Sequence, residues 1–201
     1  REPSYFFIFL SQMYYTLTGM CVYKVIDFRY DNKKGGITME KVLDVAKYII
    51  NRYEEVAGVT IDELKLHKLL YFVQREAIAI TGNPMFKEDL EGWKYGPVSP
   101  VVRNYFTDDG LSFIDEKEIQ EENKYIVNNI IHQYGGFESW KLSDLSHQEY
   151  SWKQARIGVA PLENGNHIIK IEDICKDAQK IRPYDSVYDM YYDEFEDAEG
   201  M

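Results

Sequence analysis

Two stretches of the chain, 42–56 and 66–80, carry apolar residues at the spacing of an amphipathic helix. Apolar side chains that recur every three or four positions line one face of a helix, which has to pack against another element. In the first stretch they are Val42, Val45, Ile49, Ile50, Tyr53 and Val56. In the second they are Leu66, Leu69, Leu70, Val73, Ala77 and Ile80. The pattern predicts two helices that Gly58 and Gly82 end, and it directs the chain towards a fold built by helix packing.

The rest of the chain continues this pattern with one interruption. Glycine and proline break up residues 83–98, which predicts a loop or short extended pieces, and Ser99 before Pro100 predicts a short helix as far as Phe106. Apolar periodicity predicts further helices over about 116–134, 139–146, 150–157 and 171–181. Asn164-Gly165 is typical of a hairpin turn and favours a small two-stranded element around 158–169. We expect a mostly α, single compact multi-helix domain of about six to eight helices, with at most a small two-stranded β element.

The chain is acidic, with a formal net charge of -11 over 201 residues. The last stretch, 183–201, contains seven acidic residues and neither lysine nor arginine. Such a surface disfavours nonspecific binding to nucleic acid or anionic lipid and favours basic partners. Cys21 and Cys175 belong to no metal-binding or redox motif, which favours a cytoplasmic protein with reduced thiols.

Residues 1–38 are rich in phenylalanine and tyrosine but follow neither the period of a helix nor that of a strand. Lys33-Lys34-Gly35-Gly36, shortly before Met39, is a peptide whose codons readily spell a ribosome-binding site. One hypothesis is that 1–38 is an untranslated leader, and the alternative is a disordered N-terminal extension. A membrane span is disfavoured because polar residues interrupt the only apolar run.

Three blocks of sequence resemble the Panacea domain of SocA-like antitoxins. They are Lys65-Leu-His-Lys-Leu-Leu-Tyr-Phe72, then Gly82-Asn-Pro-Met-Phe86 with Trp93-Lys-Tyr-Gly-Pro-Val-Ser-Pro-Val-Val102, and finally Leu145-Ser-His-Gln-Glu149 with Trp152 and Arg156. The resemblance places the domain at 39–182 and leaves 183–201 as an acidic aromatic tail. The motif residues that it assigns to the scaffold are Leu66, Leu69, Trp93, Gly96, Pro97, Pro100, His147 and Trp152.

The resemblance implies an antitoxin of a toxin-antitoxin system, bacterial or phage-associated. Such a protein neutralises a cognate toxin, usually encoded by the adjacent gene, by direct protein-protein binding and without enzyme activity or a cofactor. Because the family pairs one scaffold with unrelated toxins, the toxin is not identified, and the oligomeric state stays open. The alternative is an adaptor or phage-encoded interaction protein that delivers or modulates a host protein.

Six residues are candidates for contact with the toxin. Lys68 and Tyr71 lie opposite the stripe of Leu66 and Leu69, so we expect them to be exposed. Tyr95 lies in a loop stiffened by glycine and proline, where it is either a rigid anchor for a partner or a core residue. In the tail, Tyr188, Tyr191 and Phe195 share one face of a helix that can fold on a basic partner, although a solvated tail is the alternative.

Other functions have little support in the sequence. The histidines His67, His132, His147 and His167 stand at no metal-ligand spacing, so we expect no metal site. A hydrolase that uses His147 and Glu149 is a remote alternative, since residues two apart on a helix point away from each other and His147 fits a structural role. The chain has no basic arm or stripe, so direct nucleic acid binding is not expected, and neither is membrane binding.

Overall fold

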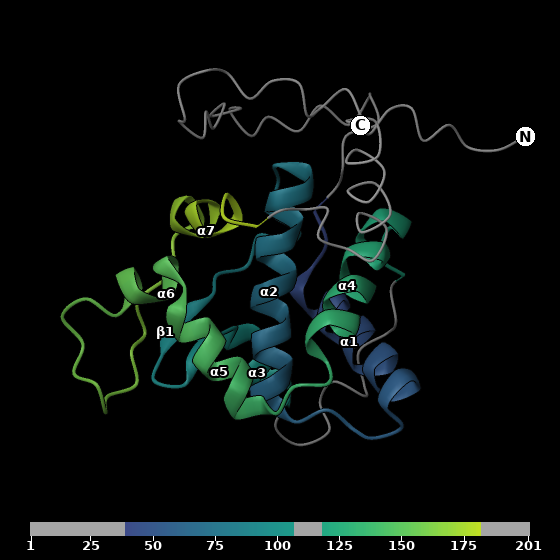
Figure 1. Cartoon of the computed structure of the whole chain (residues 1–201), viewed down its shortest axis with the longest axis horizontal. Coiled ribbons are helices and arrows are strands. Elements are labelled where there is room, and N and C mark those ends of the chain that lie inside the picture. Colours follow the sequence, from purple (N-terminus) through teal and green to yellow (C-terminus); the bar gives the residue numbers. More distant parts are fainter. Residues whose placement is uncertain (1–38, 107–117, 182–201) are drawn as a thin grey trace, which may run out of the picture. The chain divides into compact units, whose positions relative to one another are not determined.

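The structure, a computed structural model, describes residues 39–106 and 118–181. These residues form seven helices and one two-stranded antiparallel sheet, which confirms the expected mostly α fold (Figure 1). In chain order the elements are α1 (Val42–Ala57), α2 (Glu63–Thr81), β1 (Glu91–Trp93), β2 (Gly96–Val98), α3 (Pro100–Phe106), α4 (Glu121–Tyr134), α5 (Ser139–Gln148), α6 (Tyr150–Ala155) and α7 (Ile171–Ala178). The predictions for 1–38 and for the tail at 183–201 lie outside the described residues.

Helix α2 is the axis around which the other elements pack. Figure 1 shows it upright in the middle, and α1, α4, α5, α7 and β2 all contact it. Every residue from Lys65 to Arg75 is buried. A helix that is covered on all sides has to bury polar side chains as well as apolar ones, and each of these polar groups then needs a partner inside the protein.

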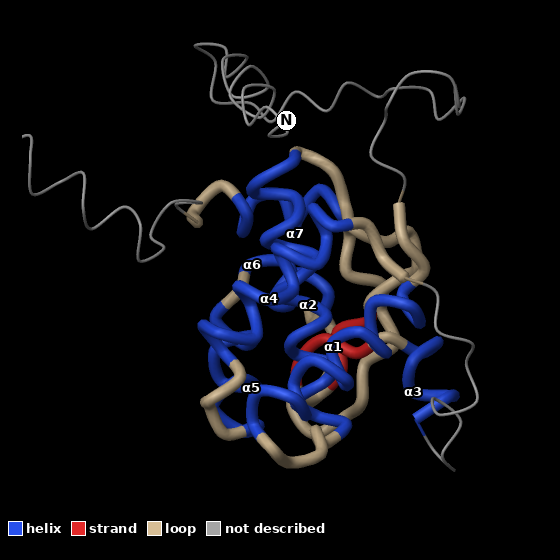
Figure 2. The backbone as a smooth tube through the Cα atoms, turned by 90° about the vertical axis from the view of Figure 1, so that its right-hand side faces the viewer, coloured by secondary structure: helices blue, strands red, loops and turns tan. Residues whose placement is uncertain are grey.

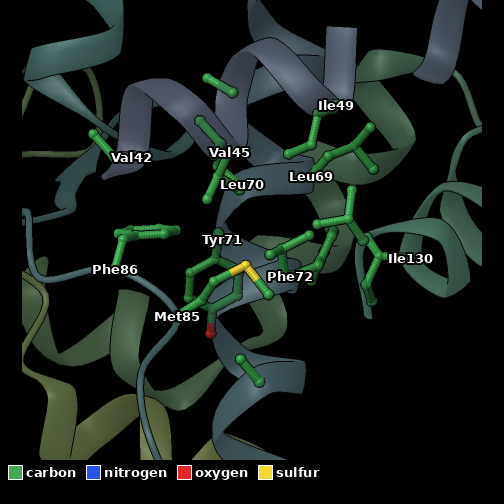
Figure 3. Close-up of a cluster of buried hydrophobic side chains, with 14 of the residues drawn as sticks. Val42, Val45, Ile49, Leu69, Leu70, Tyr71, Phe72, Met85, Phe86 and Ile130 are labelled. Carbon is green, nitrogen blue, oxygen red and sulfur yellow. The ribbon is translucent and has the colours of Figure 1, made fainter. Parts of the chain in front are cut away.

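The part of the apolar core drawn in Figure 3 lies between α1, α2 and α4, and the same cluster continues to Leu142 of α5 and Ile174 of α7. Val42, Val45 and Ile49 of α1 are fully buried there, as are Leu69 and Leu70 of α2 and Ile130 of α4. Met85 and Phe86, which follow α2 in the chain, close one side of this cluster. Each such side chain contributes about 1.5–3 kcal/mol through its removal from water, so the core accounts for the packing of α1 and α4 on α2.

The expected exposure of Lys68 and Tyr71 is wrong. Both side chains are 0% exposed. The stripe through Leu66 and Leu69 correctly identifies one buried face of α2, but the opposite face packs against β2, α5 and α7 and is buried too.

The small sheet is present, but it lies at 91–98 and not around 158–169. Its strands pair in the register Glu91 with Val98 and Trp93 with Gly96, and Figure 2 shows it in red among the blue helices. The stretch around 158–169 adds only an isolated bridge from Ile168 to Glu91. Gly165 passes so close to β1 that a Cβ there would lie 2.5 Å from the carbonyl oxygen of Gly92. The Asn164-Gly165 pair therefore serves a close approach of two segments and not a hairpin turn.

A buried carboxylate joins α6 to α7. Asp177 of α7 accepts hydrogen bonds from the backbone N–H groups of Tyr150 and Ser151 at 2.8 Å each, and from the Tyr71 hydroxyl at 3.3 Å. The first N–H groups of a helix have no partner within it, so this carboxylate caps α6. Burial raises the pKa of Asp177, but the hydrogen bonds from Ser151 and Tyr150 outweigh burial and bring the pKa below its usual range. The group is therefore charged at neutral pH.

Replacement of Asp177 by alanine is expected to lower the free energy of unfolding by about 3 kcal/mol, because it removes a helix cap and leaves buried donors without an acceptor. The matched control is Asp173→Ala on the same helix, since the Asp173 side chain pairs with the exposed Lys176. We expect that control to change stability by about 0.5 kcal/mol or less. Denaturant unfolding of both variants tests this, and equal losses would contradict the capping role.

Candidate functional site

The hairpin formed by β1 and β2 is held by side chains from three helices. Its carbonyl groups at alternate positions each accept one of these hydrogen bonds. The bonds run from Trp152 Nε1 of α6 to the Trp93 oxygen (2.9 Å), from Ser143 Oγ of α5 to the Tyr95 oxygen (2.7 Å) and from Lys68 Nζ of α2 to the Pro97 oxygen (2.9 Å). A hairpin of eight residues is marginal by itself, so these bonds hold it in one conformation.

Gly96 lets the hairpin lie directly on α2 and α5. Its φ of +106° is one that side-chain-bearing residues rarely adopt. A Cβ at this position would lie 2.4 Å from Ser146 Oγ and 2.6 Å from Lys68 Cε. Pro97 then fixes the next residue of β2, and Pro100 opens α3.

The buried amine of Lys68 is a structural donor. Burial lowers its pKa to about 7, against the opposing influence of the carboxylates of Asp62 and Glu63. The side chain reaches no solvent, so its role in the described structure is to hold the Pro97 carbonyl and not to contact a partner.

His67, the residue before Lys68 on α2, binds the backbone directly after the hairpin. Its Nδ1 accepts a hydrogen bond from the backbone N–H of Ser99 at 3.3 Å, which assigns the proton of the neutral ring to Nε2. Nε2 is buried without a hydrogen-bond partner, 3.5 Å from the Glu63 carboxylate. Burial, with the positive charges of Lys68 and Arg103, lowers the pKa of His67 to about 3, so the ring is neutral under ordinary conditions.

His147 and Glu149 serve different parts of the structure. The His147 ring stacks on Trp152 with centroids 4.0 Å apart, and this places the indole that bonds the Trp93 carbonyl. Glu149 forms an ion pair with Arg75, whose guanidinium also bonds the Tyr134 hydroxyl. This geometry gives the hydrolase hypothesis no support. Within 39–106 and 118–181, no group of three or more His, Cys, Asp or Glu is placed to hold a metal ion.

The hairpin presents two aromatic side chains on the outer side of this frame. Trp93 is partly buried, with its Nε1 bonded to Glu91 and the Arg103 guanidinium 5.0 Å above its ring. Tyr95 is 57% exposed, and Lys94 lies over its ring. A cavity of about 110 Å³ lies beside these two aromatic residues. Its other lining residues are Glu63, Leu64, His67, Val98, Arg103 and Asn164.

Of the six predicted contact residues, Tyr95 alone is exposed in the part of the chain that the structure describes. Lys68 and Tyr71 are buried, and Tyr188, Tyr191 and Phe195 lie outside the described residues. The predicted scaffold residues Leu66 and Leu69 are core residues. Sequence reasoning missed Ser143, whose hydroxyl holds the Tyr95 carbonyl, because a serine inside a polar helix carries no distinguishing pattern.

Comparison with known proteins supports the resemblance found in the sequence. Residues 66–153, which contain Lys68, the hairpin, Ser143 and Trp152, match the family described as Antitoxin SocA-like, Panacea domain. The segment 66–153 is similar to the SocA-like Panacea domain. Over 64 residues it is 36% identical to the curated protein Antitoxin SocA of Caulobacter vibrioides (strain NA1000 / CB15N), which is 32% of this chain and 34% of that relative. The chain thus matches about a third of the length of the relative, and no solved structure matches it.

Both the matched family and the matched relative are described by name as antitoxins. The geometry of the Panacea domain places most of its motif residues inside the frame that holds the hairpin. No helix in the described ranges is long and apolar enough to cross a membrane.

Lys68→Met tests the buried amine through the pH dependence of stability. The pKa of Lys68 is about 7 in the folded protein and its ordinary value is 10.5, so the unfolded chain binds more protons between these values. The contribution of Lys68 to the free energy of unfolding is therefore fully present above pH 10.5 and decreases as the pH falls towards 7. We expect the free energy of unfolding of the wild type, relative to Lys68→Met, to rise by about 2 kcal/mol between pH 7 and pH 9. Denaturant unfolding at both pH values measures it, and a constant difference would mean that the amine is not desolvated.

Proposed function

We propose that the protein is an antitoxin that neutralises a cognate protein toxin by direct binding, in the cytoplasm, with the toxin encoded by the adjacent gene. The observation that carries the proposal is the hairpin inside the matched segment, which three helices hold in place and which presents Tyr95 to solvent. The similarity to a protein named Antitoxin SocA supports the same role.

The geometry favours binding over catalysis. Rigid aromatic side chains lose little conformational freedom on association, so they are frequent anchors of protein interfaces. Two titratable side chains next to the hairpin instead hold the fold: Lys68 bonds a carbonyl and His147 stacks on an indole. The net charge of -11 favours a basic toxin, because complementary charge speeds association.

The proposal is tested by expressing the neighbouring reading frame alone and together with this protein. We expect growth arrest in the first case and normal growth in the second, with a complex of the two proteins that survives purification. A neighbouring product that is harmless alone, or that still arrests growth when this protein is present, would refute the antitoxin function. Loss of the toxin protein on co-expression would instead point to delivery to a protease.

Tyr95→Ala tests the hairpin within that complex. We expect the dissociation constant to rise at least tenfold, about 1.4 kcal/mol, because an exposed aromatic anchor is removed from a rigid support. Tyr125→Ala on α4 is the matched control, since Tyr125 is 59% exposed and lies in the first turns of its helix. Both variants should keep the wild-type unfolding midpoint. Equal affinities for the two variants would exclude the hairpin from the interface.

A further inference from the structure

One end of the domain brings together two helix ends and two helix starts. Here α1 and α4 end, and α2 and α5 begin. The buried Lys65 amine donates to the Tyr53 hydroxyl at 2.9 Å and to the Gly135 carbonyl oxygen at 3.2 Å, which ties α1 and the end of α4 to α2. The Ser139 hydroxyl donates to Asp62, which ties the start of α5 to the start of α2. The four termini are therefore fixed relative to one another.

Four exposed apolar side chains surround these ties, and we call them the apolar end. They are Val56, Val59, Phe137 and Trp140. Each lies within three residues of a tied residue: Val56 follows Tyr53 by one helical turn, Val59 precedes Asp62, and Phe137 and Trp140 flank Ser139. Trp140 is 64% exposed and the other three range from 43% to 58%. Large apolar side chains that gather on a surface, and are not scattered singly, mark an interaction site.

Negative charge surrounds the apolar end. Glu54, Glu55, Asp62 and Glu138 are exposed there. The nearby cations are the exposed Lys141, the partly exposed Arg52, which is paired with Glu55, and the exposed Arg103, which is paired with Glu63. The partial charges of the two helix ends and two helix starts offset one another, so the negative charge of this region comes from its carboxylate side chains.

We infer that the apolar end is a contact surface for a basic segment of the toxin, whose apolar side chains pack on Trp140 while its lysines or arginines face the surrounding carboxylates. The inference rests on the proposed antitoxin function. It extends the surface around Tyr95, because Ser143, which bonds the Tyr95 carbonyl, lies one turn after Trp140 on α5. In such a contact, apolar packing on Trp140 slows dissociation, and attraction to the carboxylates speeds association.

The experiment measures association and dissociation rates of the full chain with the purified toxin from the adjacent gene, at low and high salt. For Trp140→Ala we expect a dissociation rate at least tenfold faster at both salt concentrations. For the double variant Glu54→Gln/Glu138→Gln we expect an association rate several-fold slower at low salt, with the difference disappearing at high salt. Tyr125→Ala, at the opposite end of α4, should stay within twofold of the wild type in both rates.

The outcomes separate this inference from the proposed function. A wild type that binds and protects cells, with Trp140→Ala and the double variant unchanged, overturns the inference and leaves the antitoxin function intact. A wild type that neither binds nor protects overturns both. If Trp140→Ala instead converts a dimer of this chain to a monomer and leaves toxin binding unchanged, the apolar end joins two copies and the inference is wrong. Val59→Ser repeats the test should Trp140→Ala unfold.

Discussion

The burial of α2 on all sides is the constraint on which the rest of the structure depends. Polar side chains along this helix are cut off from water, and a buried polar group without a partner costs about 1–3 kcal/mol. Each one therefore bonds a different part of the chain. Lys65 bonds the end of α4, Lys68 bonds the hairpin, and His67 bonds the residue between the hairpin and α3. Tyr71 bonds α6 and α7. Gln74 bonds the backbone at Met85 and Phe86, and Arg75 bonds Glu149. The helix thus fixes its neighbours through directional bonds as well as apolar packing.

The residues of the Panacea motif have a structural role in this arrangement. Lys68, Gly96, Pro97 and Trp152 are all part of the frame that holds the hairpin, and none of them is placed as a contact for a partner. The motif therefore specifies how the hairpin is held. Under the proposed function, contacts with a partner fall to side chains that the frame presents outward, such as Tyr95, and to surfaces beside it that the motif does not include.

The number, order and approximate extent of the helices could be predicted from the sequence, because apolar periodicity and terminal glycines are local signals. The exposure of Lys68 and Tyr71 was predicted wrongly because periodicity identifies the most apolar face of a helix and does not reveal whether the opposite face is covered. A signal was present, since Tyr71, Phe72 and Ile78 lie off the stripe of Leu66 and Leu69, as is typical of a helix that is buried all round. The position of the sheet was missed because strands of three residues are too short to show a period. The exposure of Trp140 depends on tertiary packing that no local pattern records.

The two proposed contact surfaces share one support, and this affects how the protein can bind. Tyr95 and Trp140 are linked through α5, whose Leu142 and Ser146 are buried in the direction of α2 and whose Ser143 holds the hairpin. Side chains on one rigid helix and on a hairpin bonded to it keep a fixed separation in the free protein. When a partner binds both surfaces, little conformational entropy is lost in ordering them. The binding free energies of two modest contacts can then add to a higher total affinity. Under the proposed function, the polar contacts of α2 therefore contribute to recognition as well as to stability, because they hold two small surfaces in one arrangement.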